Sequence, residues 1–295
     1  MDFRFDDIGN RLKAFRLGSG LSADEIARRL GISRAALYRF EKGELTKIDT
    51  LQKLSLLLGV SVPTLLGVGV EYIASAVSYF ERLRQIEETA ERIVVLAGPV
   101  SYLLTSDSFD EKLAEVLTEN IPLDLEQRRR ALKEVGEIMT ILQRRKENFR
   151  LRRPNIINLI SSTEIERFLG NGLVGRQGLS EKILRERRLQ ARAEVVHLAE
   201  MLSDEPMGVQ VGIVPDTLPH TGFQIFRQPD RQLLSLSPFR LGEQPNVRIG
   251  VAMITTAPEA LELHQKAVAE MWRRALKAVP AAKFLRDLLD RTKRN

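Results

Sequence analysis

Short apolar runs spaced by three or four residues fill residues 8–66 and predict five short helices. Ser22 and Ser33 stand at the N-cap positions of the second and third helices. Gly31 and Gly43 follow those same two helices, where a left-handed residue is favoured. Two short helices joined by a tight turn at Gly31 are the arrangement that a helix-turn-helix requires.

The pattern changes after residue 70, where longer helices and β-branched runs take over. Apolar residues from Ile73 to Ala90 recur at helical spacing and predict one long amphipathic helix. Buried strands are predicted at "RIVVLAG" (92–98) and "NIINLIS" (155–161), and further helices at 107–116, 124–148 and 180–201.

Four β-branched runs near the end of the chain, separated by Pro, Gly and Asp, predict strands of one sheet: "VQVGIVP", "GFQIFRQ", "QLLSLSPF" and "NVRIGVAMI". Two helices, Pro258–Ala278 and Ala281–Arg291, are expected on either side of Pro280. We therefore expect an all-α domain at 1–66 and a mixed α/β (α+β) domain at 71–295, with a small sheet flanked by helices. The glycine-containing stretch "GVGV" (67–70) is expected to link them.

The third helix carries more outward-facing chemistry than its folding requires. Leu37 and Phe40 point toward the expected core, whereas the opposite face holds basic, small and aromatic side chains at four-residue spacing: Arg34, Ala35, Tyr38 and Arg39. An outward face of this composition needs an explanation other than packing.

The stretch "LSADEIARRLGISRAALYRFEKGEL…LQKLSLLLGVSVPTLL" closely resembles the XRE/Cro-type repressor family. The resemblance covers about residues 8–66 and implies a five-helix, Cro/repressor-like helix-turn-helix domain that binds double-stranded DNA. In this motif the second helix enters the major groove. Carried over by position, Arg34, Ala35 and Arg39 fall where members of this family contact bases. Tyr38 shares the face and is the fourth candidate, with either a base or a phosphate within its reach. A helix-turn-helix that only docks protein is the alternative reading.

Further contacts are expected around the reading helix. Backbone N–H groups at Ser33 and at the helix starting with Ala23 are suited to hold phosphates. Lys42 and Lys47 lie just beyond and would add salt-sensitive phosphate contacts. The resemblance also implies an ion pair between Arg16 and Glu41 that holds the unit together rather than reading DNA.

The region from about residue 71 is similar to a C-terminal domain of unknown function that follows XRE-type units in actinomycete-type regulators. The similarity is best in "GVQVGIVPDTLPHTGFQIFRQPDRQLLSLSPF" and "VRIGVAMITTAPEALELHQKAVAEMW". It implies effector sensing or partner docking and identifies no ligand. Within it, the loop "PDTLPHTG" (215–222) is the candidate pocket edge, with His220 and Phe223 as the candidate effector-binding residues.

A strongly basic stretch occupies residues 127–154, "QRRRALKEVGEIMTILQRRKENFRLRRP". Leu132, Val135 and Leu142 still mark an inward face, so a solvated charged helix face is the default interpretation. A second contact with the DNA backbone and an anionic effector site are the alternatives.

Composition sets the remaining limits. The 295 residues include no cysteine and carry a net charge of +6, which suits a polyanionic partner. No apolar run is long enough for a membrane span, and "MDFRFDDIGN" is no secretory signal, so a cytoplasmic protein is expected. We expect no cofactor and no metal.

One short stretch also suggests an enzymatic alternative. "HQK" (264–266) mimics the start of a phospholipase-D-type motif, but Met271 stands where that motif needs an aspartate, and no second copy exists. A phosphodiesterase is therefore the remote alternative, and an antitoxin or adaptor that binds a partner protein is the nearer one. The sequence favours a non-enzymatic, sequence-specific transcriptional regulator, a repressor acting as a homodimer on a pseudo-palindromic operator, with a C-terminal region that senses a small-molecule or protein effector.

Overall fold

Five short helices form the N-terminal part of the chain in the computed structural model, which describes residues 5–44, 47–124, 126–215 and 221–292. Ser22 Oγ accepts a hydrogen bond from the Glu25 amide, and Ser33 Oγ accepts one from the Ala36 amide, both at 3.1 Å. Gly31 adopts a φ of 67°, so the tight turn has the left-handed residue it requires. The five predicted helices are confirmed: α1 (Phe5–Ser19), α2 (Ala23–Leu30), α3 (Arg34–Glu41), α4 (Ile48–Leu58) and α5 (Val62–Leu66).

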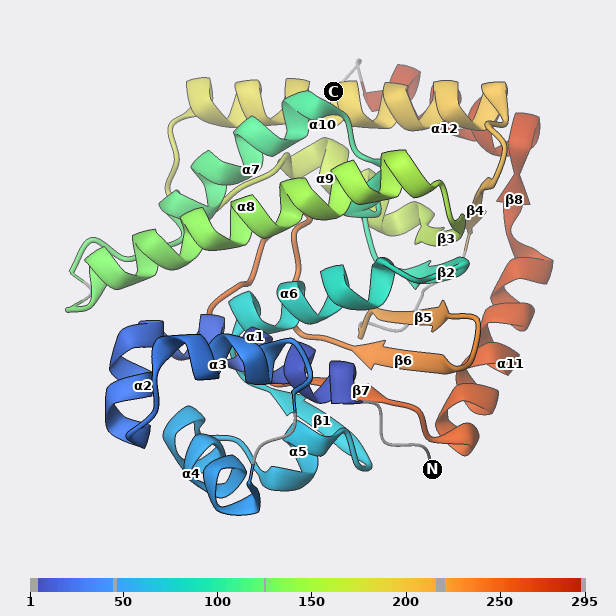
Figure 1. Ribbon diagram of the computed structural model, residues 1–295. Coiled ribbons are helices and arrows are strands. Elements are labelled where there is room, and N and C mark those ends of the chain that lie inside the picture. The colour runs from blue at the N-terminus through green and yellow to red at the C-terminus, as the bar shows by residue number, and fades with distance from the viewer. Residues whose placement is uncertain (1–4, 45–46, 125, 216–220, 293–295) are drawn as a thin grey trace.

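These helices enclose a small apolar core of their own, built from Leu12, Ala23, Ile26, Leu37 and Leu54. The core forms because each helix places its apolar positions on one face. A second set of α1, α4 and α5 residues joins the main core of the molecule instead. The N-terminal helices therefore pack against the rest of the chain and do not hang from it (Figure 1).

An eight-stranded mixed sheet organises the remainder of the described chain, in the order β1-β7-β6-β5-β2-β3-β4-β8. Strands β2, β3 and β4 are parallel to one another, and the other pairs are antiparallel. The four C-terminal strands expected in one sheet are all present, and the sheet is larger than the small one expected. Its members are β1 (Val70–Ile73), β2 (Arg92–Leu96), β3 (Asn155–Ser161), β4 (Val209–Val214), β5 (Phe223–Arg227), β6 (Gln232–Leu236), β7 (Ala252–Thr255) and β8 (Leu276–Lys277).

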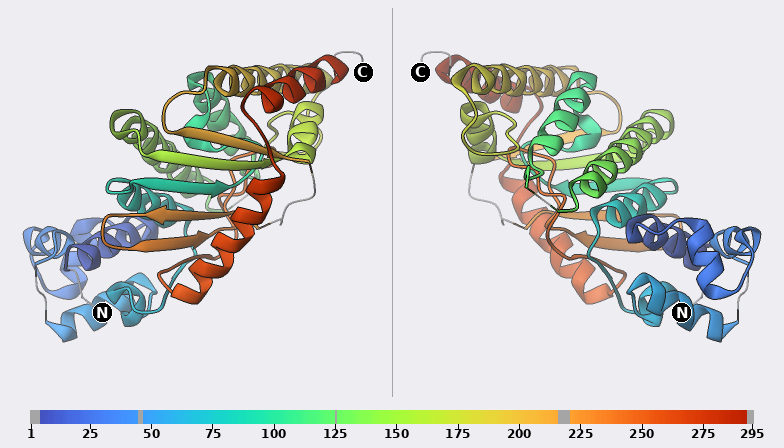
Figure 2. Two further views of the ribbon diagram at one scale, coloured as in Figure 1. Left: turned by 90° about the vertical axis from the view of Figure 1, so that its right-hand side faces the viewer. Right: turned by 90° about the vertical axis from the view of Figure 1, so that its left-hand side faces the viewer.

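Helices cover the two faces of the sheet unequally. Ile93 and Val95 of β2 belong to the larger core, whereas Val94 and Leu96 face the smaller core against α11 (Pro258–Arg274), because side chains alternate along a strand. Figure 2 shows α11 crossing one face, with α6 and α8 on the other. The remaining helical elements are α6 (Ala76–Glu87), η1 (Tyr102–Leu104), α7 (Asp107–Glu119), α8 (Arg128–Arg152), α9 (Ser162–Asn171), α10 (Glu181–Asp204) and α12 (Ala278–Thr292).

The start of the second region differs from the prediction. The expected helix from Ile73 begins at Ala76, because Ile73 ends β1, which pairs antiparallel with β7. The expected linker 67–70 contains Gly67, which caps α5, and Val70, which already belongs to β1. Pro280, expected to separate two helices, lies in the first turn of α12, where proline is tolerated. In the described part of the chain, no helix is long and apolar enough to cross a membrane.

Gly9 brings α1 against the end of α3. A Cβ at this position would lie 2.6 Å from the Glu41 carbonyl oxygen and 2.7 Å from the Gly43 nitrogen. Gly9→Ala should therefore destabilise the protein by about 1–3 kcal/mol through overpacking, which outweighs the roughly 1 kcal/mol gained from helix propensity. Urea unfolding measures the change. Gly136→Ala on α8 is the matched control: its Cβ would meet open space, so it should stabilise by up to about 1 kcal/mol.

Candidate nucleic-acid interface

The outer face of α3 presents basic side chains to solvent. Leu37 is 1% exposed and packs inward, whereas Arg34, Ala35 and Arg39 are exposed. Tyr38 is intermediate in exposure and packs in part against the helical core. The structure therefore brings the four predicted base-contacting residues together on α3, three of them fully on its open side.

Arg34 and Arg39 are held only by surface contacts. Arg34 Nε and Nη2 donate to Tyr38 Oη at 3.1 and 3.0 Å, and Nη1 lies 3.3 Å from Asp24 Oδ2. Arg39 Nε lies 3.3 Å from Glu44 Oε2. The arginine side chains are 55% and 60% exposed, and exposed ion pairs are worth about 0–1 kcal/mol. Both guanidinium groups can leave these partners for an incoming base edge at little cost.

The predicted phosphate-contacting residues all lie at helix ends. The side chain of Ala23 is buried and the Ser33 hydroxyl caps α3, so at these two positions the backbone N–H groups are the available donors. Lys42 follows α3 and Lys47 precedes α4, and both are exposed. Donors suited to phosphate are thus available at the N-termini of α2 and α3, and positive charge at the C-terminal end of α3 and the start of α4.

Arg16 and Glu41 tie α1 to α3 beneath this face. Arg16 bonds both carboxylate oxygens of Glu41, with Nη2 at 3.1 Å from Oε2. The Glu41 side chain is 6% exposed, and the Arg16 guanidinium also lies 5.9 Å from the centre of the Tyr38 ring. The pair thus holds α3, and the ring at its centre, at a fixed position on α1.

Residues 12–65 match the protein family described as helix-turn-helix, HTH_3. The N-terminal part of this chain is a helix-turn-helix region. This match supports a DNA-binding transcription regulator of XRE-like type. No curated protein matches the chain.

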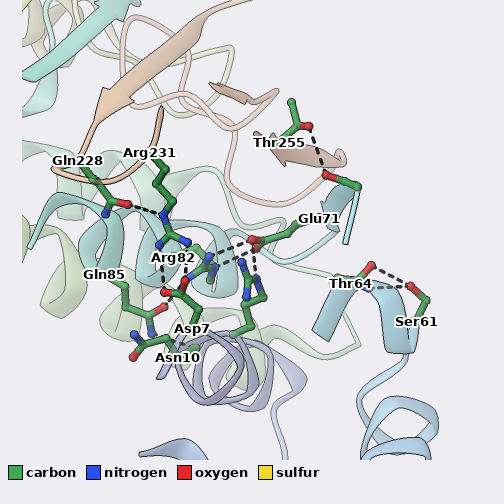
Figure 3. A network of polar contacts seen from close by, with 12 residues as sticks. Asp7, Asn10, Ser61, Thr64, Glu71, Arg82, Gln85, Gln228, Arg231 and Thr255 are labelled. Atoms are coloured by element: carbon green, nitrogen blue, oxygen red, sulfur yellow. Dashed lines mark hydrogen bonds and ion pairs between the residues drawn. The ribbon is translucent and has the colours of Figure 1, made fainter. Parts of the chain in front are cut away.

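A charge network, buried in its centre and partly buried at Asp7 and Arg231, joins the helix-turn-helix region to the sheet (Figure 3). Glu71 of β1 accepts from Arg11 Nε on α1 at 2.6 Å and from Arg82 Nε and Nη2 on α6, both at 3.0 Å. Asp7 of α1 forms a bidentate pair with Arg231, which lies between β5 and β6. We call the five residues Asp7, Arg11, Glu71, Arg82 and Arg231 the joint.

The acidic members of the joint predict how stability depends on pH. Burial acts to raise the pKa of Glu71, but the charges of Arg82 and Arg11 outweigh it and hold that pKa below its ordinary value of 4.5. Asp7 behaves alike: burial raises its pKa, and the hydrogen bond and charge of Arg231 bring it below 3.8.

Carboxylates with a depressed folded pKa bind protons more readily when unfolded, so their contribution is present above the unfolded pKa. Stability should hold as pH falls from 7 to about 5, then decline below about pH 4.5 as these groups take up protons. Urea unfolding at a series of pH values measures this. In an Asp7→Asn/Glu71→Gln variant, the free energy of unfolding should fall less steeply below pH 4.5. A decline as steep as that of the wild type would contradict the assignment.

Of the two predicted effector-binding residues, the structure describes only Phe223. His220 lies outside the described residues. Phe223 is buried at the start of β5, borders a cavity at that end of the sheet and packs edge-on against His264, with ring centroids 4.8 Å apart. Lys266, two residues on, is 69% exposed and paired with Glu262. On α11, the His264 side chain therefore packs against the sheet, whereas the Lys266 side chain lies in solvent.

The basic stretch 127–154 is partly explained by buried ion pairs. Arg145 binds Glu87 through Nε and Nη2 at 2.9 and 2.7 Å, and Lys146 lies 2.8 Å from Asp110. Both basic side chains are 3% exposed. Part of the charge is thus internal, which the default interpretation of a solvated face did not anticipate. Arg130, near the start of α8, reaches the Ser19 carbonyl at the end of α1, at 3.4 Å.

Proposed function

We propose that this protein is a sequence-specific transcriptional regulator, a repressor, in which α3 reads bases in the major groove. The observation that carries the proposal is the exposed face of α3, on a region that matches the helix-turn-helix family. Arginine grips guanine O6 and N7 with two parallel hydrogen bonds, and the Ala35 methyl group suits the methyl of thymine. The exposed Lys42 and Lys47, which both follow α3 in the chain, supply the salt-dependent part of the affinity.

The protein acts as a homodimer on a pseudo-palindromic operator. A single helix of eight residues reads only a few base pairs, so two copies related by a two-fold axis are needed for useful specificity. The region from β1 onward holds the second copy and senses an effector. Support comes from the joint, which makes the position of α1 depend on β1, α6 and the β5–β6 turn.

The function proposed is binding and regulation, not catalysis. His264 Nδ1 donates to the Ala260 carbonyl and its ring packs edge-on against Phe223, whereas Lys266 is exposed and paired with Glu262. The "HQK" residues therefore do not converge on one reacting atom. Among the described residues, no group of His, Asp and Glu is arranged to hold a metal ion.

Selection of bound sequences from random duplex DNA tests the proposal, with the Arg34→Ala/Arg39→Ala variant alongside. The wild-type protein should enrich an inverted repeat with half-sites about one helical turn apart, and the variant should lose it. Circular dichroism confirms that the variant is folded. No enrichment by folded wild-type protein would overturn the proposal and favour a helix-turn-helix that docks another protein.

A further inference from the structure

A cavity of about 170 Å³ lies at the carboxyl end of β2. Strand β2 has parallel β3 on one side and antiparallel β5 on the other, so the chain direction changes at this point of the sheet. In open α/β sheets, ligands bind outside the carboxyl ends of strands where the connections diverge. The segment that follows β2 (97–102), the start of β5 and the segment 237–244 enclose the cavity.

The walls combine aromatic rings with tightly packed backbone. Tyr79 lies with its ring centre 5.4 Å from that of Phe80 and 5.7 Å from that of Phe239, and all three line the cavity. At the rim, a Cβ on Gly242 would lie 2.7 Å from the Gly98 carbonyl oxygen. The main chains of two distant segments therefore meet there, and the wall they form is fixed.

Two of the arginines in the lining, Arg145 and Arg167, already have counter-charges. Arg145 is paired with Glu87 through Nε and Nη2, and Arg167 is paired with Glu243 at 2.8 Å. Beside the buried pair of Arg145 and Glu87, a ligand with a net charge would be desolvated without a new counter-ion, which is unfavourable. Arg240, also in the lining, is exposed to solvent. The pair with Glu87 leaves the Nη1 group of Arg145 to donate to an uncharged acceptor. Ser101, Ser237 and Gln224 add neutral polar atoms to the lining.

We propose that this cavity is the effector site and takes a small, uncharged, planar molecule of one ring with a hydrogen-bond-accepting substituent. Size supports one ring, because an engineered cavity of about 150 Å³ in another protein holds one benzene molecule. The flat aromatic walls favour a planar ring over a saturated one. This inference rests on the proposed function for its biological meaning, but binding to the cavity does not require DNA.

Helix α6 connects the cavity with the DNA-reading helices. Tyr79 and Phe80 line the cavity, whereas Ser78 and Gln85 of the same helix hold α1. Ser78 Oγ donates to the Ala14 carbonyl and Gln85 Nε2 to the Asn10 carbonyl, both at 3.0 Å. A ring inserted beside Tyr79 and Phe80 displaces α6, and α1 must follow through these bonds and the joint. Because coupling is reciprocal, DNA must change ligand affinity by the same factor.

Three isosteric probes test the chemical class: benzamide is uncharged, benzoate anionic and benzamidine cationic. Methyl NMR spectra of the full chain are recorded during titration with each probe. Benzamide should shift the methyl signals of Val95, Val100 and Leu241, which line the cavity, and leave those of Leu263 on α11 unmoved. It should bind at least ten-fold more tightly than either charged probe. Shifts by none of the probes would overturn the site, and equal binding of benzoate would overturn the uncharged class.

A variant whose side chain fills the cavity provides an independent test of the binding site. Gln224 lines the cavity from β5, so Gln224→Trp should abolish benzamide binding. Gln210→Trp, at the exposed position of β4, places the same ring away from this cavity and should bind benzamide as the wild type does. The methyl shifts in the wild-type protein decide the question if the filling variant fails to fold.

Measurements of DNA affinity in the presence of benzamide separate this inference from the proposed function. Saturating benzamide should change the affinity of the wild-type protein for its selected duplex at least three-fold, and leave that of Gln224→Trp unchanged. Benzamide binding with no change in DNA affinity would overturn the coupling through α6. Failure to select any duplex would overturn the proposed function and leave the binding result standing.

Discussion

Glu71→Gln should lower the free energy of unfolding by about 3–5 kcal/mol, the usual cost of removing one partner from a buried ion pair. Glu71 is 5% exposed, and its two carboxylate oxygens serve Arg11 and Arg82, which are 7% and 2% exposed. A glutamine keeps one acceptor oxygen and turns an NH2 group toward the other guanidinium. Two buried cations would then face each other without the anion between them.

Chemical unfolding in urea at pH 7 measures this loss, with Glu262→Gln as the control. Glu262 is 65% exposed and pairs with Lys266 one turn away on α11, so its replacement should cost about 0–1 kcal/mol. If the two variants lose the same small amount of stability, the joint does not hold the helix-turn-helix region to the sheet as described.

Replacing the α3 arginines should remove sequence discrimination, with about 1–3 kcal/mol lost for each bidentate contact with guanine. Arg34→Ala and Arg39→Ala should each bring the affinity for the selected duplex toward that for a scrambled one. Each substitution should change the free energy of unfolding very little, because both arginine side chains are more than half exposed.

Lys42→Ala is the matched comparison, since it removes a positive charge near the same helix without removing a base contact. It should weaken binding to the selected and the scrambled duplex alike and reduce the salt slope by about 1. Fluorescence anisotropy at several salt concentrations measures both quantities. A uniform loss of affinity in all three variants would contradict this division of roles.

Local signals were sufficient to predict the helix-turn-helix region. Neighbours within four residues decide the helix caps at Ser22 and Ser33 and the left-handed conformation of Gly31. The spacing of these residues in the sequence is therefore enough to predict the helix ends. The β-branched runs predicted strands for the same reason. Strand β1 was missed because its four residues continue, without a break in apolar spacing, into the positions of α6.

The joint and the cavity depend on contacts between distant parts of the chain. In the sequence alone, nothing distinguishes Arg11, Glu71 and Arg82 from ordinary surface charges. Their pairing becomes visible only when α1, β1 and α6 lie together in the fold. The loop 215–222 was predicted as the pocket edge, and Phe223 beside it does border the cavity. The segments 97–102 and 237–244 meet there only because the sheet order sets β2 beside β5 and β6 beside β5.

Dimethyl sulfate footprinting on the selected duplex tests most directly whether α3 reads the major groove, because the reagent methylates guanine N7 there and adenine N3 in the minor groove. The wild-type protein should protect guanine N7 in each half-site, and Arg34→Ala/Arg39→Ala should lose this protection at concentrations that still saturate the DNA. Protection that persists in the variant, or that falls only on adenine N3, would contradict the account.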